Sequence, residues 1–194
     1  MTRILAFAGS ARRDSLNKKL ARAAAQFARE AGAEATFVDL DDYPMPVYHG
    51  DLEAVSGMPE HAARLRELFL AHDALLIASP ENNSSMTSLL KNTIDWLSRD
   101  VGDGEGAASG LAPWQGKVAG LMAASPGAFG GTRALPHLRQ VLSALGVTVL
   151  GMQVPVPKAH EAFGPDGAIA NERVAKSVRA LAAAVASTAR ALKA

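Results

Sequence analysis

Short apolar runs alternate along the chain with longer segments in which apolar residues recur every three or four positions. The apolar runs fall at residues 3–10, 34–40, 74–80, 117–125 and 147–156, and the segments with helical spacing fall at 15–31, 61–72, 87–98, 132–145 and from 172 onward. Such runs predict strands that are buried on both faces, and the helical spacing predicts amphipathic helices. This repeated alternation predicts a parallel sheet with helices on both faces.

Two segments do not follow this pattern. Residues 41–57 (DDYPMPVYHGDLEAVSG) contain turn-forming residues throughout and predict a long irregular loop, and residues 102–110 (GDGEGAASG) predict a flexible segment or a lid. We find no internal repeat and no second domain, so residues 1–194 are expected to form one domain. The Rossmann and flavodoxin-like strand orders both fit the alternation, and both place ligands beyond the carboxyl ends of the strands.

The amino-acid composition mainly excludes classes of partner and of chemistry. The 20 Lys and Arg residues nearly balance the 19 Asp and Glu residues, which removes the general electrostatic argument for a nucleic-acid partner. Without cysteine the chain has no disulfide, thiolate or Cys-ligated metal chemistry, and its five histidines lack metal-ligand spacing. No apolar run reaches membrane-spanning length, and the first ten residues carry no signal-peptide cleavage pattern. We therefore expect a cytoplasmic protein with no membrane contact and no metal site.

The loop after the first predicted strand, GSARRDSLNKKL at residues 9–20, combines hydroxyls, an amide and a cation. Ser10, Arg12, Ser15 and Asn17 precede or enter a predicted helix N-terminus, where free N–H groups and the helix dipole favour an anion. The guanidinium of Arg12 suits a phosphate. The loop has neither the G-x-G-x-x-G motif nor the Gly-Lys-Ser/Thr end of a Walker loop. A phosphate site and a plain helix start capped by Ser15 both remain open.

The loop after the third predicted strand, SPENNSSM at residues 79–86, has more hydrogen-bonding groups than a turn needs. Pro80 fixes the chain direction, and Asn82 and Asn83 tolerate unusual backbone angles while their amides both donate and accept. Such a surface suits the edge of a flat heterocycle, for example a flavin or a pterin. The alternative is a turn followed by an N-cap from Ser84 or Ser85.

The loop after the fourth predicted strand, SPGAFGGTRA at residues 125–134, contains three glycines that would let the backbone approach a ligand closely. Phe129 is a candidate to cover a ring, although the loop can equally be a tight corner. Its position supports a role in ligand binding, because it is expected at the same sheet edge as the other two loops.

Together these segments resemble the NADPH-dependent FMN reductase family, a flavodoxin-like group that includes bacterial quinone, azo-dye and chromate reductases. Residues 9–21 are similar to its G-S-x-R-x-x-S-x-N-x-x-L phosphate loop, and residues 79–99 to its S-P-E-Y-N-x-S segment and following helix. Residues 125–146 resemble its glycine-rich third segment, and residues 43–53 its loop after the second strand. The matches run over most of the chain in the family's order and spacing.

The resemblance implies a flavodoxin-like three-layer sandwich with a five-stranded parallel sheet in the order 2-1-3-4-5. It also implies contacts with FMN: to the phosphate from Ser10, Arg12, Ser15, Leu16 and Asn17, to the isoalloxazine ring from Pro80, Glu81, Asn82, Asn83 and Ser84, and to its other side from Ser125 and Gly127. The ring contacts would come largely from backbone atoms, so no side chain is assigned as acid, base or nucleophile.

The implied activity is hydride transfer from NAD(P)H to bound FMN and then to a quinone, flavin or similar small-molecule acceptor. Members are commonly homodimers or homotetramers whose flavin site borders a neighbouring subunit, which fits the loop at residues 43–51. The alternative is a non-catalytic flavodoxin-like module that carries electrons or binds a ligand with weak or no flavin. The sequence does not distinguish NADH from NADPH or identify the acceptor.

Asn82 departs from the family pattern, because the family usually has tyrosine at this position. A short amide thus replaces an aromatic ring that can pack beside a flavin. Since aromatic residues are only 5% of the chain, few others can compensate. The candidates are Phe129, Trp114 and the partner's Tyr48.

Overall fold

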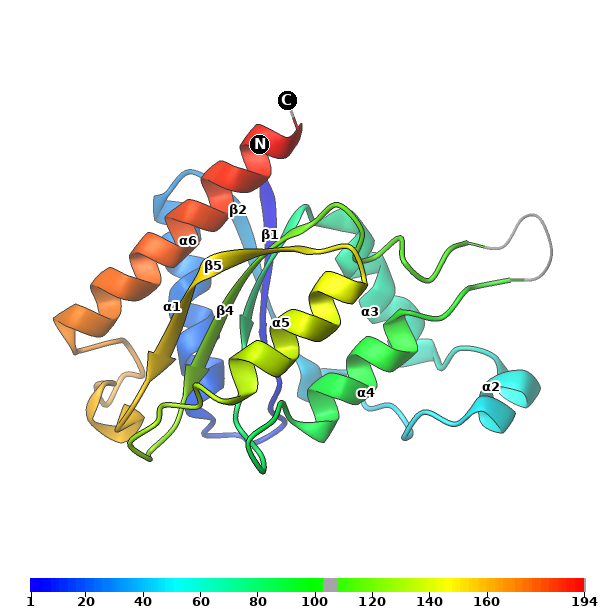
Figure 1. Cartoon of the computed structure of the whole chain (residues 1–194), viewed down its shortest axis with the longest axis horizontal. Coiled ribbons are helices and arrows are strands. Elements are labelled where there is room, and N and C mark those ends of the chain that lie inside the picture. Colours follow the sequence, from blue (N-terminus) through cyan, green and yellow to red (C-terminus); the bar gives the residue numbers. More distant parts are fainter. Residues whose placement is uncertain (103–107, 194) are drawn as a thin grey trace.

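The computed structural model describes residues 1–102 and 108–193, which form a five-stranded sheet between two layers of helices (Figure 1). The strands are β1 (Arg3–Ala8), β2 (Glu34–Asp39), β3 (Ala74–Ala78), β4 (Val118–Ala124) and β5 (Thr148–Val156). The helices are α1 (Leu16–Glu30), α2 (Gly50–Ser56), α3 (Glu60–Ala71), α4 (Ser88–Leu97), α5 (Ala134–Ala144) and α6 (Glu172–Lys193), with short 3₁₀ turns at η1 (Leu40–Asp42) and η3 (Ala159–Glu161). All neighbouring strands are parallel in the order β2-β1-β3-β4-β5, which confirms the flavodoxin-like order.

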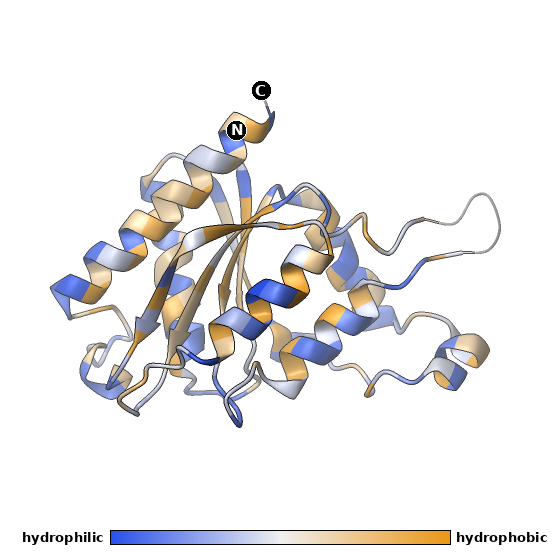
Figure 2. Cartoon of the chain, viewed as in Figure 1, coloured by the Kyte–Doolittle hydropathy of each residue, from blue (hydrophilic) through white to orange (hydrophobic). Residues whose placement is uncertain are grey.

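The sheet separates two apolar cores, because successive side chains of a strand point to opposite faces. In β1, Ile4 and Ala6 pack with α1 and α6, whereas Leu5 and Phe7 pack with α3, α4 and α5. Every residue of β3 and β4 is buried, as the continuous apolar runs predict. In Figure 2 the apolar colour runs along the sheet and along parts of the helices.

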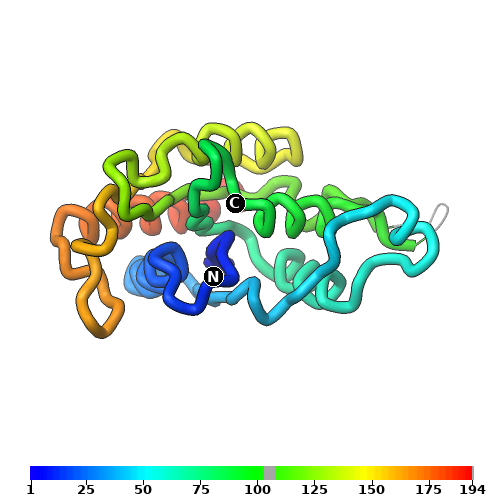
Figure 3. The backbone as a smooth tube through the Cα atoms, turned by 90° about the horizontal axis from the view of Figure 1, so that it is seen from below, coloured from blue at the N-terminus to red at the C-terminus, as the bar shows by residue number. Residues whose placement is uncertain are grey.

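The strands end together at one end of the molecule. Ala8 of β1 lies beside Ala78 of β3, which lies beside Met122 of β4. Figure 3 looks onto this end and shows the loops that follow β1, β3 and β4 next to one another. Both chain termini lie at the opposite end (Figure 1).

The expectation of an irregular loop over residues 41–57 is wrong in part, because this segment contains the end of η1 and all of α2. None of the residues of α2 is buried. The helix begins at the N-cap His49, whose ring nitrogen accepts from the Asp51 N–H at 3.2 Å, and it ends before Gly57, whose φ is 68°. Caps rather than a buried face therefore define this helix, so it has no apolar stripe to reveal it.

The expected lid at residues 102–110 falls largely on residues 103–107, which lie outside the described residues. On either side of them, Val101 and Ala108 exchange backbone hydrogen bonds of 2.9 and 2.8 Å. Within residues 1–102 and 108–193, no helix combines the length and the apolarity needed to cross a bilayer.

Candidate active site

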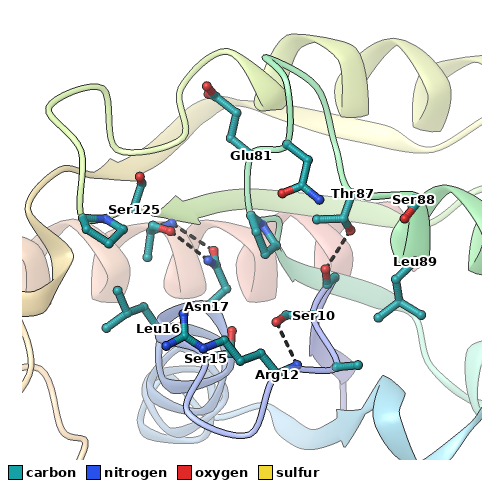
Figure 4. Close-up of a pocket in the computed structure, with 16 residues that line it drawn as sticks. Ser10, Arg12, Ser15, Leu16, Asn17, Glu81, Thr87, Ser88, Leu89 and Ser125 are labelled. Carbon is teal, nitrogen blue, oxygen red and sulfur yellow. Dashed lines mark hydrogen bonds between the residues drawn. The ribbon is translucent and has the colours of Figure 1, made fainter.

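The loops after β1, β3 and β4 surround a cavity of about 430 Å³ at the carboxyl ends of the strands (Figure 4). This is the place where open parallel sheets bind ligands. Nine predicted residues line it, namely Ser10, Arg12, Ser15, Leu16, Asn17, Pro80, Glu81, Asn82 and Ser125. The other three predicted residues, Asn83, Ser84 and Gly127, do not line it. Within the described chain, no group of three His, Asp or Glu side chains is placed to hold a metal ion.

The first loop presents the N-terminus of α1 to the cavity. Ser15 is the N-cap and accepts a hydrogen bond from the Lys18 N–H at 3.3 Å. The first N–H groups of a helix have no acceptor within the helix, so this end favours an anion. The Ser10 hydroxyl oxygen accepts from the Arg12 N–H at 3.3 Å, and the exposed Arg12 side chain adds positive charge. The loop therefore has both geometry and charge for a phosphate ester.

The Asn17 side chain connects the first loop with the fourth strand. Its amide donates to the Ala124 carbonyl at 2.8 Å and accepts from the Ala124 N–H at 2.9 Å, as the pair of dashed lines in Figure 4 shows. Asn17 is 4% exposed, and Ala124 is the last residue of β4. The side chain thus fixes the start of α1 against the end of β4.

Gly9 and Thr87 join the first and third loops. The Thr87 hydroxyl donates to the Gly9 carbonyl at 2.7 Å and accepts from the Leu90 N–H at 3.2 Å, so Thr87 is the N-cap of α4. The alternative of an N-cap from Ser84 or Ser85 is therefore wrong, because the chain turns back at residues 82–85 before the helix starts. A side chain at Gly9 would place its Cβ 2.9 Å from the Leu90 Cβ, so glycine permits this contact.

The polar residues 82–85 form a tight reversal. Asn82 and Ser85 exchange backbone hydrogen bonds of 3.0 Å in both directions, and the two residues between them have positive φ, 50° for Asn83 and 65° for Ser84. Asparagine adopts this backbone region more readily than most residues, which explains one of the two amides. The reversal carries Asn83 and Ser84 away from the cavity and leaves Asn82 on its lining.

Glu81 links the third loop to the fourth. Its carboxylate accepts from the Arg133 Nε at 2.7 Å and from the Arg133 N–H at 3.0 Å, and it forms an ion pair with the same guanidinium. Burial alone would raise the pKa of Glu81, but the hydrogen bonds and charge of Arg133 outweigh it and lower the pKa. Glu81 is therefore ionised near neutral pH, and its negative charge is paired.

The fourth loop offers Ser125 to the cavity, and the Ser125 hydroxyl oxygen accepts from the Gly127 N–H at 3.2 Å. Phe129 is 65% exposed and does not line the cavity, and the Arg133 guanidinium carbon lies 5.1 Å from the centre of its ring. Trp114 is fully buried against Phe69, so it is not available to a ligand.

Sequence reasoning missed seven lining residues: Gly9, Ala11, Thr87, Ser88, Leu89, Ala124 and Pro126. Most adjoin predicted residues and contribute mainly backbone or small side chains, so their types carry little signal. Thr87 had a usable signal, because threonine directly before an apolar helical segment is a common N-cap.

The lining fits FMN in chemistry. A helix N-terminus with serine hydroxyls and Arg12 matches a phosphate, and Pro80, Asn82 and Leu89 give a surface that carries no net charge for a ring. Glu81 does not oppose the phosphate strongly, because Arg133 neutralises it.

Comparisons with known proteins identify the family of this chain. A model of the NADPH-dependent FMN reductase family matches residues 2–161. An NAD(P)H-dependent FMN reductase of Pseudomonas aeruginosa is 36% identical over 179 residues, which cover 91% of this chain and 89% of that protein. A 2-hydroxy-1,4-benzoquinone reductase of Burkholderia is 36% identical over 148 residues, which cover 76% and 74%. The solved structure of FerB, a flavoenzyme NAD(P)H:(acceptor) oxidoreductase of Paracoccus denitrificans, has a TM-score of 0.79 at 29% identity and matches 98% of both chains. This chain therefore belongs to the NADPH-dependent FMN reductase family and is an oxidoreductase that uses FMN and NAD(P)H.

Proposed function

We propose that this reductase binds FMN in the cavity at the carboxyl ends of β1, β3 and β4 and reduces a small quinone with electrons from NAD(P)H. The observation that carries the proposal is the α1 N-terminus with Ser10, Arg12 and Ser15, which faces a cavity bordered by the third and fourth loops. The quinone is supported by relatives, because the Burkholderia protein and a Pseudomonas putida protein, 37% identical over 144 residues, are both quinone reductases.

The phosphate end of the cofactor is assigned to the first loop. Ser10, Arg12, Ser15 and the backbone of Leu16 and Asn17 would bind the phosphate, because they combine hydroxyl donors, a cation and free helix N–H groups. The Asn17 side chain supports this arrangement through Ala124 rather than by contact.

The ring end is assigned to the third and fourth loops. Pro80, Glu81, Asn82 and Ser125 would border it, whereas Asn83, Ser84 and Gly127 do not line the cavity. When bound, FMN supplies the redox chemistry, accepting hydride from NAD(P)H and giving up electrons to the acceptor. The chain orients both substrates at the ring and keeps Glu81 ionised through Arg133, so Glu81 is not a proton donor near neutral pH.

We also propose a homodimer or homotetramer located in the cytoplasm. The segment from Tyr43 to Met58 supports association, because α2 buries none of its residues and Val47 and Val55 are 84% and 87% exposed. Tyr48 packs on Trp96 of its own chain and donates to Glu53, so a role at a neighbouring flavin would require its polar edge rather than a free ring.

One preparation tests the proposed function. Purified protein reconstituted with FMN should show flavin absorbance and should oxidise NADPH or NADH when benzoquinone is added, with a faster rate than free FMN alone. A protein that FMN does not stabilise against heat, and that oxidises no NAD(P)H with benzoquinone, would contradict the proposal and favour a non-catalytic module.

A further inference from the structure

Lys18, in the first turn of α1, binds residues 11 and 15 of the loop that precedes this helix. Its side chain is 3% exposed, and its ammonium donates to the Ala11 carbonyl at 3.3 Å. Its backbone N–H donates to the Ser15 hydroxyl oxygen at 3.3 Å. A buried ammonium is rare unless it is paired, so its position under this loop calls for an explanation.

Asp39 neutralises the Lys18 ammonium. Its Oδ1 lies 2.7 Å from the Lys18 Nζ and also accepts from the Asp41 N–H at 3.1 Å, while its Oδ2 is 3.7 Å from the Arg22 guanidinium. Asp39 is the last residue of β2 and is paired in register with Ala8, the last residue of β1. The carboxylate is therefore fixed by the sheet, and it fixes the ammonium in turn.

The peptide between Ala11 and Arg12 is held at both of its polar ends. Lys18 binds the Ala11 carbonyl, and the Ser10 hydroxyl oxygen accepts from the Arg12 N–H at 3.3 Å. Carbonyl and N–H of one trans peptide lie in one plane and point in opposite directions. Fixing the carbonyl therefore sets the direction of the N–H that the Ser10 oxygen binds.

This peptide controls two groups that face the cavity. Because the Ser10 oxygen accepts from the Arg12 N–H, the hydroxyl hydrogen remains available to donate to an anion. The same peptide sets where the Arg12 side chain starts. Ser10, Ala11 and Arg12 all line the cavity, whereas Lys18 does not.

We infer that Lys18 is a positioning residue for phosphate recognition, which acts through the Ala11–Arg12 peptide rather than by contact with the ligand. The inference rests on the proposed FMN site, because it requires the phosphate to bind at the first loop. It makes Lys18 a determinant of the preference for FMN, a phosphate ester, over riboflavin, the corresponding neutral alcohol.

The test measures the dissociation constants of FMN and riboflavin for the apoprotein by quenching of flavin fluorescence. In Lys18→Met the FMN affinity should fall by about tenfold, the size expected for a lost charged hydrogen bond, while riboflavin affinity stays the same. Lys19→Met is the matched control on α1, because the Lys19 side chain lies beside Gly167 and not at the Ala11 carbonyl that Lys18 binds, and its FMN preference should equal that of the wild type.

A second variant, Lys18→Met with Asp39→Asn, removes both charges and is the form to use if Lys18→Met does not fold. Its preference for FMN should remain low. Recovery of the wild-type preference would overturn the inference, because the unpaired Asp39 charge rather than the loop position would then explain the loss.

Equal weakening of FMN and riboflavin in Lys18→Met, or an unchanged ratio, would also overturn it. A wild-type protein that binds FMN and riboflavin equally well gives a different result: it contradicts the proposed phosphate site itself.

Discussion

Asn17 joins two segments that are 107 residues apart, the start of α1 and the end of β4. The two hydrogen bonds require one donor and one acceptor on the same buried side chain. In Asn17→Asp a carboxylate oxygen would face the Ala124 carbonyl, so we expect a loss of about 2 kcal/mol in the free energy of unfolding. Urea denaturation of the wild type and the variant measures this difference in unfolding free energy.

Asn171→Asp is the matched control. The Asn171 side-chain oxygen accepts from the Val174 N–H at 3.1 Å, at the exposed start of α6. Aspartate fills that role equally well, so the unfolding free energy should stay within about 0.5 kcal/mol. Equal losses in the two variants would contradict the role assigned to Asn17.

Asn82 is the lining residue at which an aromatic ring is missing. Its backbone is fixed by the Ser85 pairing, so a larger side chain at this position would extend from the same loop. Asn82→Tyr should bind FMN several-fold more tightly, since an offset aromatic pair contributes about 0.5–1.5 kcal/mol. A flavin titration measures it, with Asn82→Leu as the control for apolar bulk alone. Unchanged or weaker binding would mean that this position does not limit affinity.

At the scale of elements, the Glu81–Arg133 pair connects the loop after β3 with the start of α5. The pKa of Glu81 is lowered in the folded state, so its stabilisation is present above the ordinary value of about 4.3 and is lost as the pH falls through the folded pKa. The unfolding free energy of the wild type should therefore exceed that of Glu81→Gln by about 0.5–1 kcal/mol at pH 6, and the difference should shrink as the pH is lowered below about 4.3. Urea unfolding at several pH values measures this difference. A difference in unfolding free energy that stays constant as the pH falls would contradict the ion pair.

At Gly120, β4 lies close against side chains of α6. A Cβ at this position would be 2.7 Å from the Val185 Cγ2, in a core without space to move. Gly120→Ala should cost about 1–3 kcal/mol of unfolding free energy through overpacking. Gly151→Ala on β5, where no atom lies within 4 Å of the added Cβ, is the control and should be nearly neutral.

Elements were predictable from the sequence where packing leaves a periodic signal. Strands β1, β3 and β4 bury continuous apolar runs, and α1, α3, α4, α5 and α6 bury a helical stripe. The edge strands β2 and β5 are buried at few positions, so the expectation of burial on both faces is wrong for them, and α2 buries none of its residues and could not be found in this way. The site was predictable as three loops at one sheet edge, but not in its internal contacts. The partner of Asn17 is remote in sequence, and the reversal at residues 82–85 moves two predicted residues off the lining.

At the scale of the whole molecule, the end opposite the site has its own buried charge. Lys117 is 7% exposed and donates to the His72 carbonyl. Burial lowers its pKa, although Asp73 opposes this, so between the folded pKa and about 10.4 the unfolded chain binds more protons. The unfolding free energy of the wild type should thus rise relative to Lys117→Met as the pH increases from 7 toward 10. Lys176→Met, at an exposed position, should show no such trend in urea unfolding.

The same end of the molecule brings the two chain termini together. Asp73 accepts from the Arg3 N–H at 2.8 Å and pairs with the Lys193 ammonium at 2.6 Å, so the first strand and the last helix meet at one carboxylate. The loops after β1, β3 and β4, which line the cavity, lie at the opposite end (Figure 1). An electrode surface or a fusion partner attached through either terminus would therefore face away from the cavity and leave it open to small molecules from solution.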